Sequence, residues 1–376
     1  MIAGGGTGGH VVPSLQIARA LVARGHDPRS IELFGSYRGQ EATLWPALEF
    51  PFTLLPGRGI RRSARPRAVW ANMGAVLGLL WATVASVASF VRRRPRVVVV
   101  VGGYASLPAG LAAVVTRAPL VLVNTDAVPG AVNALLGRFA AANAIAFPGT
   151  DLPRAHLTGT PVRPELGSFN GSTAARHEAR STLGLPIERQ TLAVYGGSLG
   201  ARSINVAAAD LARRWSDRRD LSIYHVTGRR DYGQFAPEGV GPGADPGVDE
   251  AAHGLHYAVV PYEERTPELF GAADIFVCRA GAMTVAELLV CGVPAILVPL
   301  PGAPRDHQTR NAEALVAAGA AVLVPDAECD ADRLAAELTI LLSDTARLAA
   351  MSAAARALGH PDAAARVAEL VDANAH

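Results

Sequence analysis

The stretch Gly4-Gly5-Gly6-Thr7-Gly8-Gly9-His10 follows the short apolar run Met1–Ala3 and precedes a helical pattern over Ser14–Ala23. A glycine-rich turn at this place lets backbone N–H groups approach an anion, and the helix N-terminus favours negative charge there. A parallel strand usually has about five residues, so the short first run also predicts that translation starts a few residues earlier. The stretch predicts a Rossmann-like strand, loop and helix at the start of the chain.

The glycine spacing leaves the ligand of this loop open. Gly4, Gly6 and Gly9 match the dinucleotide pattern G-x-G-x-x-G, and Glu32 lies near the distance expected of a ribose-binding acid. A tight strand–helix turn without a ligand has the same spacing, and His10 would then serve as a helix cap. The pattern alone therefore does not identify a cofactor.

A second loop of this kind, Tyr195-Gly196-Gly197-Ser198-Leu199-Gly200, occurs in the other half of the chain. It again follows an apolar run and precedes a helical pattern, and it offers N–H groups and the Ser198 hydroxyl to a diphosphate. A dehydrogenase needs only one such loop. Two loops, one in each half, favour two Rossmann-like domains over a dehydrogenase.

Short apolar runs without alternation recur along the chain, as expected for parallel strands that are covered on both faces. The predicted strands are Ser30–Gly35, Val97–Val101, Leu120–Asn124, Ala144–Phe147, Leu192–Tyr195, Leu221–Val226, Ala258–Val260, Ile275–Cys278, Ala295–Val298 and Ala321–Val324. Helical patterns lie between them, which predicts an α/β fold. A domain boundary is expected near Pro161–Pro164.

Two further motifs follow predicted strands in the second half. Cys278–Glu287 places a turn of small residues before a helix, with Glu287 one turn inside, where it could bind vicinal hydroxyls or act as a first-turn acid. Asp306–Asn311 places imidazole and amide groups where they suit sugar hydroxyls or simple helix capping by Asp306. Asp330-Ala331-Asp332 is interpreted as a helix start rather than a metal site.

Composition limits the class of protein. The 376 residues are 50% hydrophobic and 18% charged, which excludes disorder as the main state. Three cysteines are too few for a disulfide scaffold and favour a reducing compartment. The first residues lack the charged and apolar regions of a signal peptide. Residues 1–163 carry a net charge of +11 and residues 164–376 a net charge of −9, which predicts an anionic partner for the first half.

The segment Val69–Val91 has 23 residues without a charge and is flanked by arginines on both sides. A span of the membrane is disfavoured, because it would divide one predicted sheet between the two sides. We expect a helix, broken near Gly74 or Gly78, with one apolar side at a membrane interface or, alternatively, buried in the domain. That side and its basic flank comprise Trp70, Leu77, Trp81, Val84, Arg61, Arg62 and Arg93. Nucleic acid is not expected, because aromatic residues do not alternate with the arginines.

Seven motifs in this order resemble the MurG family of bacterial peptidoglycan N-acetylglucosaminyltransferases. They are the loop ending in His10, Gly102-Gly103-Tyr104, Ala127–Gly130, Gly159–Arg163, Gly196–Ser198, Arg279–Glu287 and His307-Gln308. The resemblance implies a GT-B fold, with two Rossmann-like domains facing across a cleft. It divides the chain into an acceptor- and membrane-facing domain (1–163), a UDP-sugar domain (164–345) and C-terminal helices that pack back toward the first domain (346–376).

The resemblance also implies an activity and a place for it. The family transfers GlcNAc from UDP-GlcNAc to the 4-hydroxyl of MurNAc in undecaprenyl-linked lipid I, with inversion, and gives lipid II for peptidoglycan synthesis and thus for cell shape and division. It implies a peripheral protein on the cytoplasmic face of the cell membrane, bound to an anionic surface and in contact with other cell-wall enzymes. No metal or other cofactor is implied.

By resemblance, His10 is the general base. The implied UDP-GlcNAc ligands are Thr7, Gly8, Gly9, Asp126, Arg163, Ser198, Tyr262, Glu263, Ala282, Met283, Thr284, Val285, Glu287, His307 and Gln308. The implied acceptor contacts are Gly102, Gly103 and Tyr104.

The chain departs from the family at Val123-Asn124-Thr125-Asp126, where the family has His-Glu-Gln-Asn. Asp126 accepts hydrogen bonds but cannot donate them as Asn does, and it adds negative charge. Two alternatives therefore stay open: a GT-B transferase with a different sugar or lipid acceptor, and a non-catalytic paralogue that binds UDP-sugar.

Overall fold

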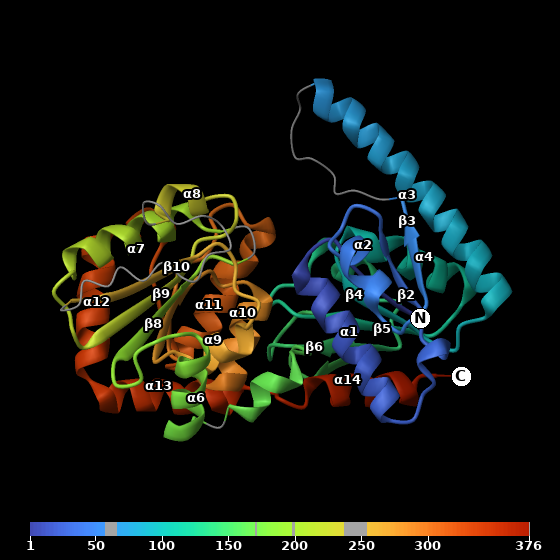
Figure 1. Ribbon diagram of the computed structural model, residues 1–376. Coiled ribbons are helices and arrows are strands. Elements are labelled where there is room, and N and C mark those ends of the chain that lie inside the picture. The colour runs from blue at the N-terminus through green and yellow to red at the C-terminus, as the bar shows by residue number, and fades with distance from the viewer. Residues whose placement is uncertain (57–65, 170, 198–199, 237–253, 376) are drawn as a thin grey trace. The chain divides into compact units, whose positions relative to one another are not determined.

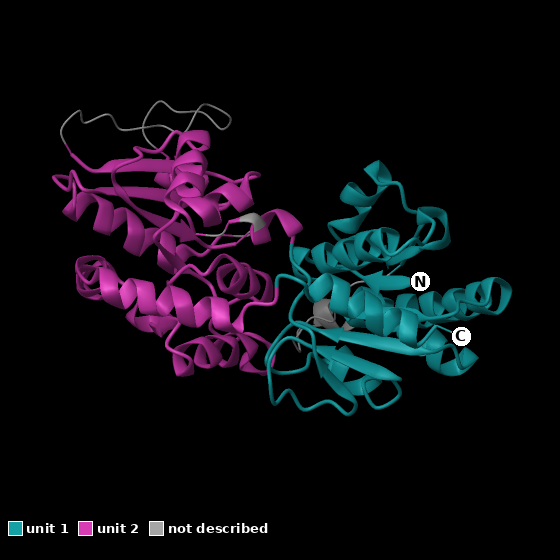
Figure 2. Ribbon diagram, turned by 90° about the horizontal axis from the view of Figure 1, so that it is seen from below, with its two compact units in different colours: residues 1–162, 361–376 teal, residues 163–360 magenta. Residues whose placement is uncertain are grey.

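The computed structural model describes residues 1–56, 66–169, 171–197, 200–236 and 254–375. The chain folds into two compact units (Figure 2). Unit 1 comprises Met1–Val162 and Pro361–His376, and unit 2 comprises Arg163–His360. The segment predicted as 346–376 is thus divided between the units after His360.

Unit 1 contains a seven-stranded sheet in the order β3-β2-β1-β4-β5-β6-β7, and all of its strand pairs are parallel. The strands are β1 (Ile2–Gly4), β2 (Leu33–Ser36), β3 (Phe52–Leu55), β4 (Val98–Gly102), β5 (Leu120–Asn124), β6 (Ala142–Ile145) and β7 (Ala155–Leu157). The prediction omitted β3 and β7. Both are edge strands with exposed or half-buried residues, so they lack the apolar run that marks the central strands.

Helices cover both faces of this sheet, which explains its uninterrupted apolar strands. Along β4, Val99 and Val101 pack into one core with residues of α1 and α14, whereas Val98 and Val100 pack into a second core beside α3 and α4. The helices of unit 1 are α1 (Gly8–Ala23), α2 (Glu41–Leu44), α3 (Pro66–Arg93), α4 (Leu107–Thr116), α5 (Ala131–Leu136) and α14 (Ala363–Ala373). The last helix of the chain therefore completes the core of the unit that the chain begins.

Unit 2 contains a six-stranded parallel sheet in the order β10-β9-β8-β11-β12-β13. Its strands are β8 (Gln190–Tyr195), β9 (Leu221–Val226), β10 (His256–Val260), β11 (Ile275–Cys278), β12 (Ala295–Leu297) and β13 (Ala321–Leu323). The predicted α/β class with parallel sheets is confirmed in both units.

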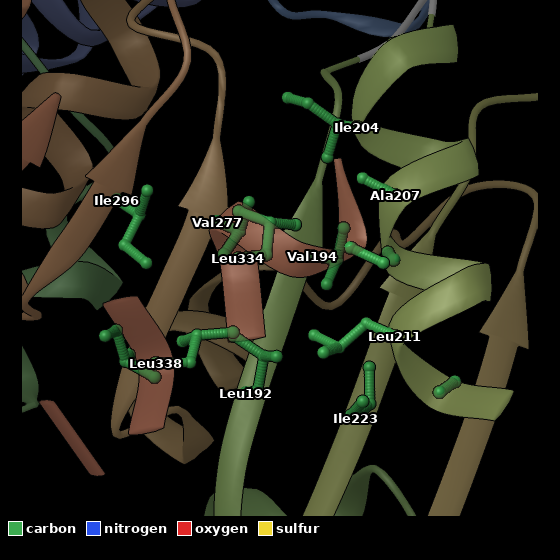
Figure 3. Close-up of a cluster of buried hydrophobic side chains, with 14 of the residues drawn as sticks. Leu192, Val194, Ile204, Ala207, Leu211, Ile223, Val277, Ile296, Leu334 and Leu338 are labelled. Carbon is green, nitrogen blue, oxygen red and sulfur yellow. The ribbon is translucent and has the colours of Figure 1, made fainter. Parts of the chain in front are cut away.

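Figure 3 shows one core of unit 2, in which Leu192 and Val194 of β8 meet helices on one face of the sheet. Leu211 of α7 and Leu334 and Leu338 of α12 are fully buried there. The helices of unit 2 are α6 (Thr173–Thr182), α7 (Arg202–Arg214), α8 (Tyr232–Phe235), α9 (Thr266–Ala272), α10 (Ala282–Cys291), α11 (His307–Ala317), α12 (Ala331–Ser343) and α13 (Thr345–Leu358).

The predicted uncharged helix is present as α3, and it is continuous rather than broken near Gly74 or Gly78 (Figure 1). A glycine inside a helix costs only about 1 kcal/mol, and space is open around Gly78. Asn72–Arg93 contains an 18-residue window with a mean hydropathy of 1.9, and the helix could cross a membrane by length and composition alone. The strands on either side of it, β3 and β4, belong to one sheet, which argues against a crossing.

One side of α3 packs on α4 and the other is exposed. Ala82 and Phe90 are buried, whereas Leu77 and Trp81 are each 64% exposed and Val84 is 61% exposed. The alternative of a helix buried in the domain is therefore wrong for this side. Arg93 makes an ion pair with Glu32.

Candidate functional site

Each sheet has one point at which the strand order reverses. In open parallel sheets, ligands bind at the carboxyl ends of the strands at such a point. In unit 1 the order reverses between β1 and β4, which are followed by the first glycine-rich loop and by Gly102–Tyr104. In unit 2 it reverses between β8 and β11, which are followed by the second glycine-rich loop and by the start of α10.

His10 lies against the end of β4 in unit 1. Its Nδ1 is 3.2 Å from the Thr7 hydroxyl oxygen. Gly102 and Gly103 have positive φ angles of 107° and 77°. A Cβ atom on Gly102 would lie 3.2 Å from His10 Cδ2, and one on Gly103 would lie 3.1 Å from Nδ1. The two glycines thus make the space in which the imidazole sits.

The start of α1 is open to a ligand. Thr7 occupies the N-cap without a side-chain capping bond, and the first turn contains no acid. Tyr104 packs on the loop, since a Cβ atom on Gly6 would be 3.0 Å from Tyr104 Cε1. The geometry brings the predicted residues Thr7, Gly8, Gly9, His10, Gly102, Gly103 and Tyr104 to one edge of the unit 1 sheet.

Glu41 also belongs to this edge, although the sequence analysis did not identify it. The side chain is fully buried. It accepts hydrogen bonds from the backbone N–H of Gly6 at 2.9 and 3.1 Å and from that of Ser36 at 2.9 Å. A glutamate 35 residues from its partner has no signal in a single sequence, because only the fold brings the two together.

The dinucleotide interpretation of the first loop is wrong. Glu32 precedes β2 and accepts a hydrogen bond from Thr53 Oγ1 at 2.7 Å, so it lies at the amino end of the strands and not beside the loop. The Gly6 N–H, which would face a pyrophosphate in such a site, is bonded to Glu41.

The departure from the family motif lies at the end of β5. Asn124 Nδ2 donates to the Asp126 carbonyl oxygen at 2.5 Å, and Asn133 Nδ2 donates to Asn124 Oδ1 at 3.0 Å. Asn124 and Asn133 are buried. Asn124 stands where the family has Glu, so no carboxylate is present at this position. Its side chain instead holds the turn that carries Asp126. The sequence analysis did not identify Asn133.

In unit 2, α10 begins at the carboxyl end of β11 with its N-terminal N–H groups uncapped. Gly281 is the N-cap and has no side chain to cap the helix. The first turn contains no acid. It includes the predicted residues Ala282, Met283, Thr284 and Val285. An uncapped helix N-terminus favours an anion.

Two oppositely charged side chains flank this helix start. Glu287 is 7% exposed and Arg163 lies close enough to lower its pKa. Neither side chain has a hydrogen-bond partner among the residues that the structure describes. A cation and a buried carboxylate that both lack hydrogen-bond partners, beside a helix N-terminus, suit a ligand that combines phosphate with hydroxyl groups.

Burial raises the pKa of Glu287 from 4.5 to about 7, with a smaller lowering by Arg163. The folded state therefore holds this proton more tightly than the unfolded state, and stability falls as the pH rises from about 4.5 to 7. We expect Glu287→Gln to raise the free energy of unfolding by about 2 kcal/mol more at pH 8 than at pH 5. Urea unfolding at the two pH values measures this, with Glu264→Gln, at an exposed position, as the control; an equal effect at both values would contradict the raised pKa.

Arg279, which opens the motif ending at Glu287, is occupied within the protein. Its guanidinium donates to the Val298 carbonyl oxygen at 3.1 Å, to Asp326 Oδ1 at 2.5 Å and to Ser203 Oγ at 3.1 Å. It ties the ends of β11 and β12 to the first turn of α7 and to the turn after β13, so it supports the site rather than binding a ligand.

The other predicted residues of unit 2 divide by what their side chains contact. Tyr262 is half-exposed, and the Arg229 guanidinium lies 4.8 Å from its ring centroid. Glu263 is buried and bonded to Tyr224 and Arg265, so its side chain is not available to a ligand.

His307 and Gln308 begin α11 after β12. His307 Nδ1 is 2.8 Å from the Pro304 carbonyl oxygen. Gln308 Oε1 accepts from the Leu300 N–H at 2.9 Å, which leaves its amide NH2 group to donate. Asp330 caps α12 by accepting from the Arg333 N–H at 2.8 Å, which confirms the helix-start interpretation of that acid.

Some predicted residues lie outside the described part of the structure. They are Ser198, Arg61, Arg62 and the side chain of Trp70. Within the residues that are described, no group of three or more His, Cys, Asp or Glu side chains could hold a metal ion.

Family models cover most of the chain. Residues 1–145 match the glycosyltransferase family 28 N-terminal domain, and residues 191–367 match the glycosyltransferase family 28 C-terminal domain.

Curated relatives match over nearly the full length. A relative from Desulforudis audaxviator (strain MP104C) is 38% identical over 99% of this chain and 97% of its own. One from Alkalilimnicola ehrlichii (strain ATCC BAA-1101 / DSM 17681 / MLHE-1) is 41% identical over 98% of this chain and 97% of its own. Both are named UDP-N-acetylglucosamine–N-acetylmuramyl-(pentapeptide) pyrophosphoryl-undecaprenol N-acetylglucosamine transferase.

Solved structures agree with these matches. The crystal structure of Acinetobacter baumannii MurG matches with a TM-score of 0.74 and 27% identity, over 99% of this chain and 98% of that one. The UDP-GlcNAc 2-epimerase from Neisseria meningitidis, at 13% identity and a TM-score of 0.65 over 99% and 98% of the two chains, shares the fold alone.

Proposed function

The chain belongs to glycosyltransferase family 28, and from this membership we propose that it transfers GlcNAc from UDP-GlcNAc to the MurNAc 4-hydroxyl of lipid I, giving lipid II. The names and near-complete coverage of its relatives support this activity. It is a UDP-GlcNAc-dependent N-acetylglucosaminyltransferase of peptidoglycan synthesis. Through the cell wall it would contribute to cell shape and division.

The observation that carries the proposal is that Arg163 and the buried Glu287 lie close together beside the start of α10 without hydrogen-bonding each other. UDP offers a diphosphate to the helix N–H groups and Arg163, and two ribose hydroxyls to the Glu287 carboxylate. All three protein groups lie in unit 2, and none of them has a side-chain hydrogen-bond partner among the described residues. Tyr262 would pack on uracil, and Gln308 and His307 would bind the GlcNAc hydroxyls.

The proposed reaction is a single in-line displacement. The MurNAc 4-oxygen forms a bond to the anomeric carbon of GlcNAc while the bond from that carbon to the UDP oxygen breaks, so the configuration inverts. His10 takes the proton of the attacking hydroxyl. The start of α10 and Arg163 stabilise the negative charge that develops on UDP. These positive groups lead us to propose that transfer needs no added metal.

UDP release from UDP-GlcNAc tests the function, measured with and without a lipid I analogue in detergent and EDTA. Acceptor-dependent release supports the transferase. Release that occurs without EDTA but is lost when EDTA is added would contradict the metal-independent mechanism. Binding of UDP-GlcNAc without release would instead favour a different acceptor or a non-catalytic paralogue. Release from another UDP-sugar would assign the departure at Asp126 to donor specificity.

We further propose that α3 attaches the protein to the cytoplasmic face of the cell membrane. There it would reach its lipid acceptor and contact other cell-wall enzymes. The exposed side with Leu77, Trp81 and Val84 supports this attachment. The exposed Arg92 and Arg94 at the end of the helix also support it, since a basic residue near an anionic surface contributes about 1 kcal/mol.

We expect Leu77→Ser with Trp81→Ser to lower binding to vesicles containing anionic lipid at least tenfold, because two large apolar side chains no longer enter the interface. Sedimentation with vesicles measures the bound fraction. Ile340→Ser, at an exposed apolar residue of unit 2, is the matched control. Unchanged binding of the double variant would contradict attachment through this side of α3.

A further inference from the structure

Glu41, the first residue of α2, is a buried acid without an ion-pair partner among the described residues, and its carboxylate bonds to the loop that carries the candidate base. We propose that Glu41 is a positioning residue, whose carboxylate holds the first glycine-rich loop, and through it Thr7 and His10, in the geometry that transfer needs. The inference rests on the proposed function, because it assigns His10 a part in the reaction.

The surroundings of Glu41 are shaped around its carboxylate. A Cβ atom on Gly5 or on Gly39 would overlap the carboxylate, and one on Gly35 would lie 2.6 Å from Glu41 Cγ. Three glycines, one in the first glycine-rich loop and two in β2 and the turn after it, thus make room for one acid. A buried carboxylate is costly unless its oxygens are hydrogen-bonded, and here the bonds come from the backbone of Gly6 and Ser36.

Gly6 links this carboxylate to the candidate base. Gly6 has a positive φ of 97°, a conformation that few other residues adopt, and both Glu41 oxygens accept its N–H. The next residue is Thr7, whose hydroxyl contacts His10 Nδ1. On the other side of the turn, a Cβ atom on Gly103 would lie 2.6 Å from the Gly5 carbonyl oxygen. A shift at Gly6 would therefore move the Thr7 hydroxyl that contacts His10 and also Gly103, which packs beside the imidazole.

Glu41→Gln tests this positioning role because it preserves size and removes charge. The amide NH2 group would face the Gly6 N–H, donor against donor, so the loop is expected to rearrange. We expect kcat to fall at least tenfold, while UDP affinity and stoichiometry, which report on unit 2, stay unchanged. Glu49→Gln, at an exposed acid of the same unit, should have wild-type kcat.

A double-mutant cycle with His10→Ala separates positioning from general stability. If Glu41 acts through His10, Glu41→Gln should change kcat less than twofold in the His10→Ala background. An equal loss in both backgrounds would overturn the proposal, as would wild-type kcat in the single variant. Absence of transfer by the wild-type protein would contradict the proposed function instead.

Discussion

Replacing His10 by Ala should lower kcat about 100- to 10,000-fold, the usual contribution of a general base, while UDP affinity stays at the wild-type value. The variant loses the group proposed to accept the proton of the attacking hydroxyl. UDP affinity should not change because Arg163, Glu287 and the start of α10 belong to unit 2, whereas His10 belongs to unit 1. Steady-state transfer and calorimetric titration with UDP measure the two quantities.

His156→Ala is a suitable control for this variant, since His156 is exposed on β7 of the same unit. It should have wild-type kcat and UDP affinity. Turnover of His10→Ala within threefold of wild type would contradict the assignment of the base. A loss confined to the acceptor KM would make His10 an acceptor-binding residue.

Replacing Arg163 by Ala should weaken UDP binding about 30- to 150-fold, because charge-assisted hydrogen bonds to a phosphate contribute about 2–3 kcal/mol. The loss should be confined to the phosphates, so the affinity for uridine should change less than twofold. Arg163 also lowers the pKa of Glu287. Protonation of Glu287 at low pH should weaken UDP binding, because the carboxylate is then lost as an acceptor for the ribose hydroxyls. In the variant the pKa of Glu287 should be higher, so this weakening should begin at a higher pH.

Calorimetric titrations of UDP and of uridine at pH 6 and pH 8 measure these effects. Arg347→Ala, at an exposed position of α13, is the control and should bind both ligands as wild type does. Equal losses for UDP and uridine would show that Arg163 supports the fold of the site rather than the diphosphate.

Local patterns in the sequence predict much of the fold. Val98–Gly102 and Leu120–Asn124 are buried on both faces, and their apolar runs are visible without any structure. The edge strands β3 and β7 were not predicted, because partial exposure removes the apolar run. The continuity of α3 was also not predicted, because two glycines in a long helix weaken the local signal without breaking the helix.

The residues of the candidate site also fall into those that local sequence patterns predict and those that only the folded structure reveals. The glycine-rich loops, the start of α10 and Glu287 follow from strand–loop–helix spacing, which is local. Glu41 bonds to Gly6, which is 35 residues away, and Asn133 of α5 bonds back to Asn124 at the end of β5. Both roles depend on how these elements pack, which no local pattern specifies. Arg279 was grouped with a ligand-binding motif, and its bonds to Asp326 and Ser203 become visible only in the folded structure, because α7 and the turn after β13 are distant in sequence.

The return of α14 to unit 1 affects the order in which the protein can be built during translation. Val367 and Val371 complete a core whose other members include Ile2, Val11 and Val121, and Asp372 pairs with Arg24 and His26. Domains generally fold as units while the ribosome still holds the chain. Here unit 2 has its complete sequence after His360, whereas unit 1, although its first strand is synthesised first, is complete only when α14 has left the exit tunnel. The acceptor half of the proposed enzyme would therefore mature after the nucleotide half.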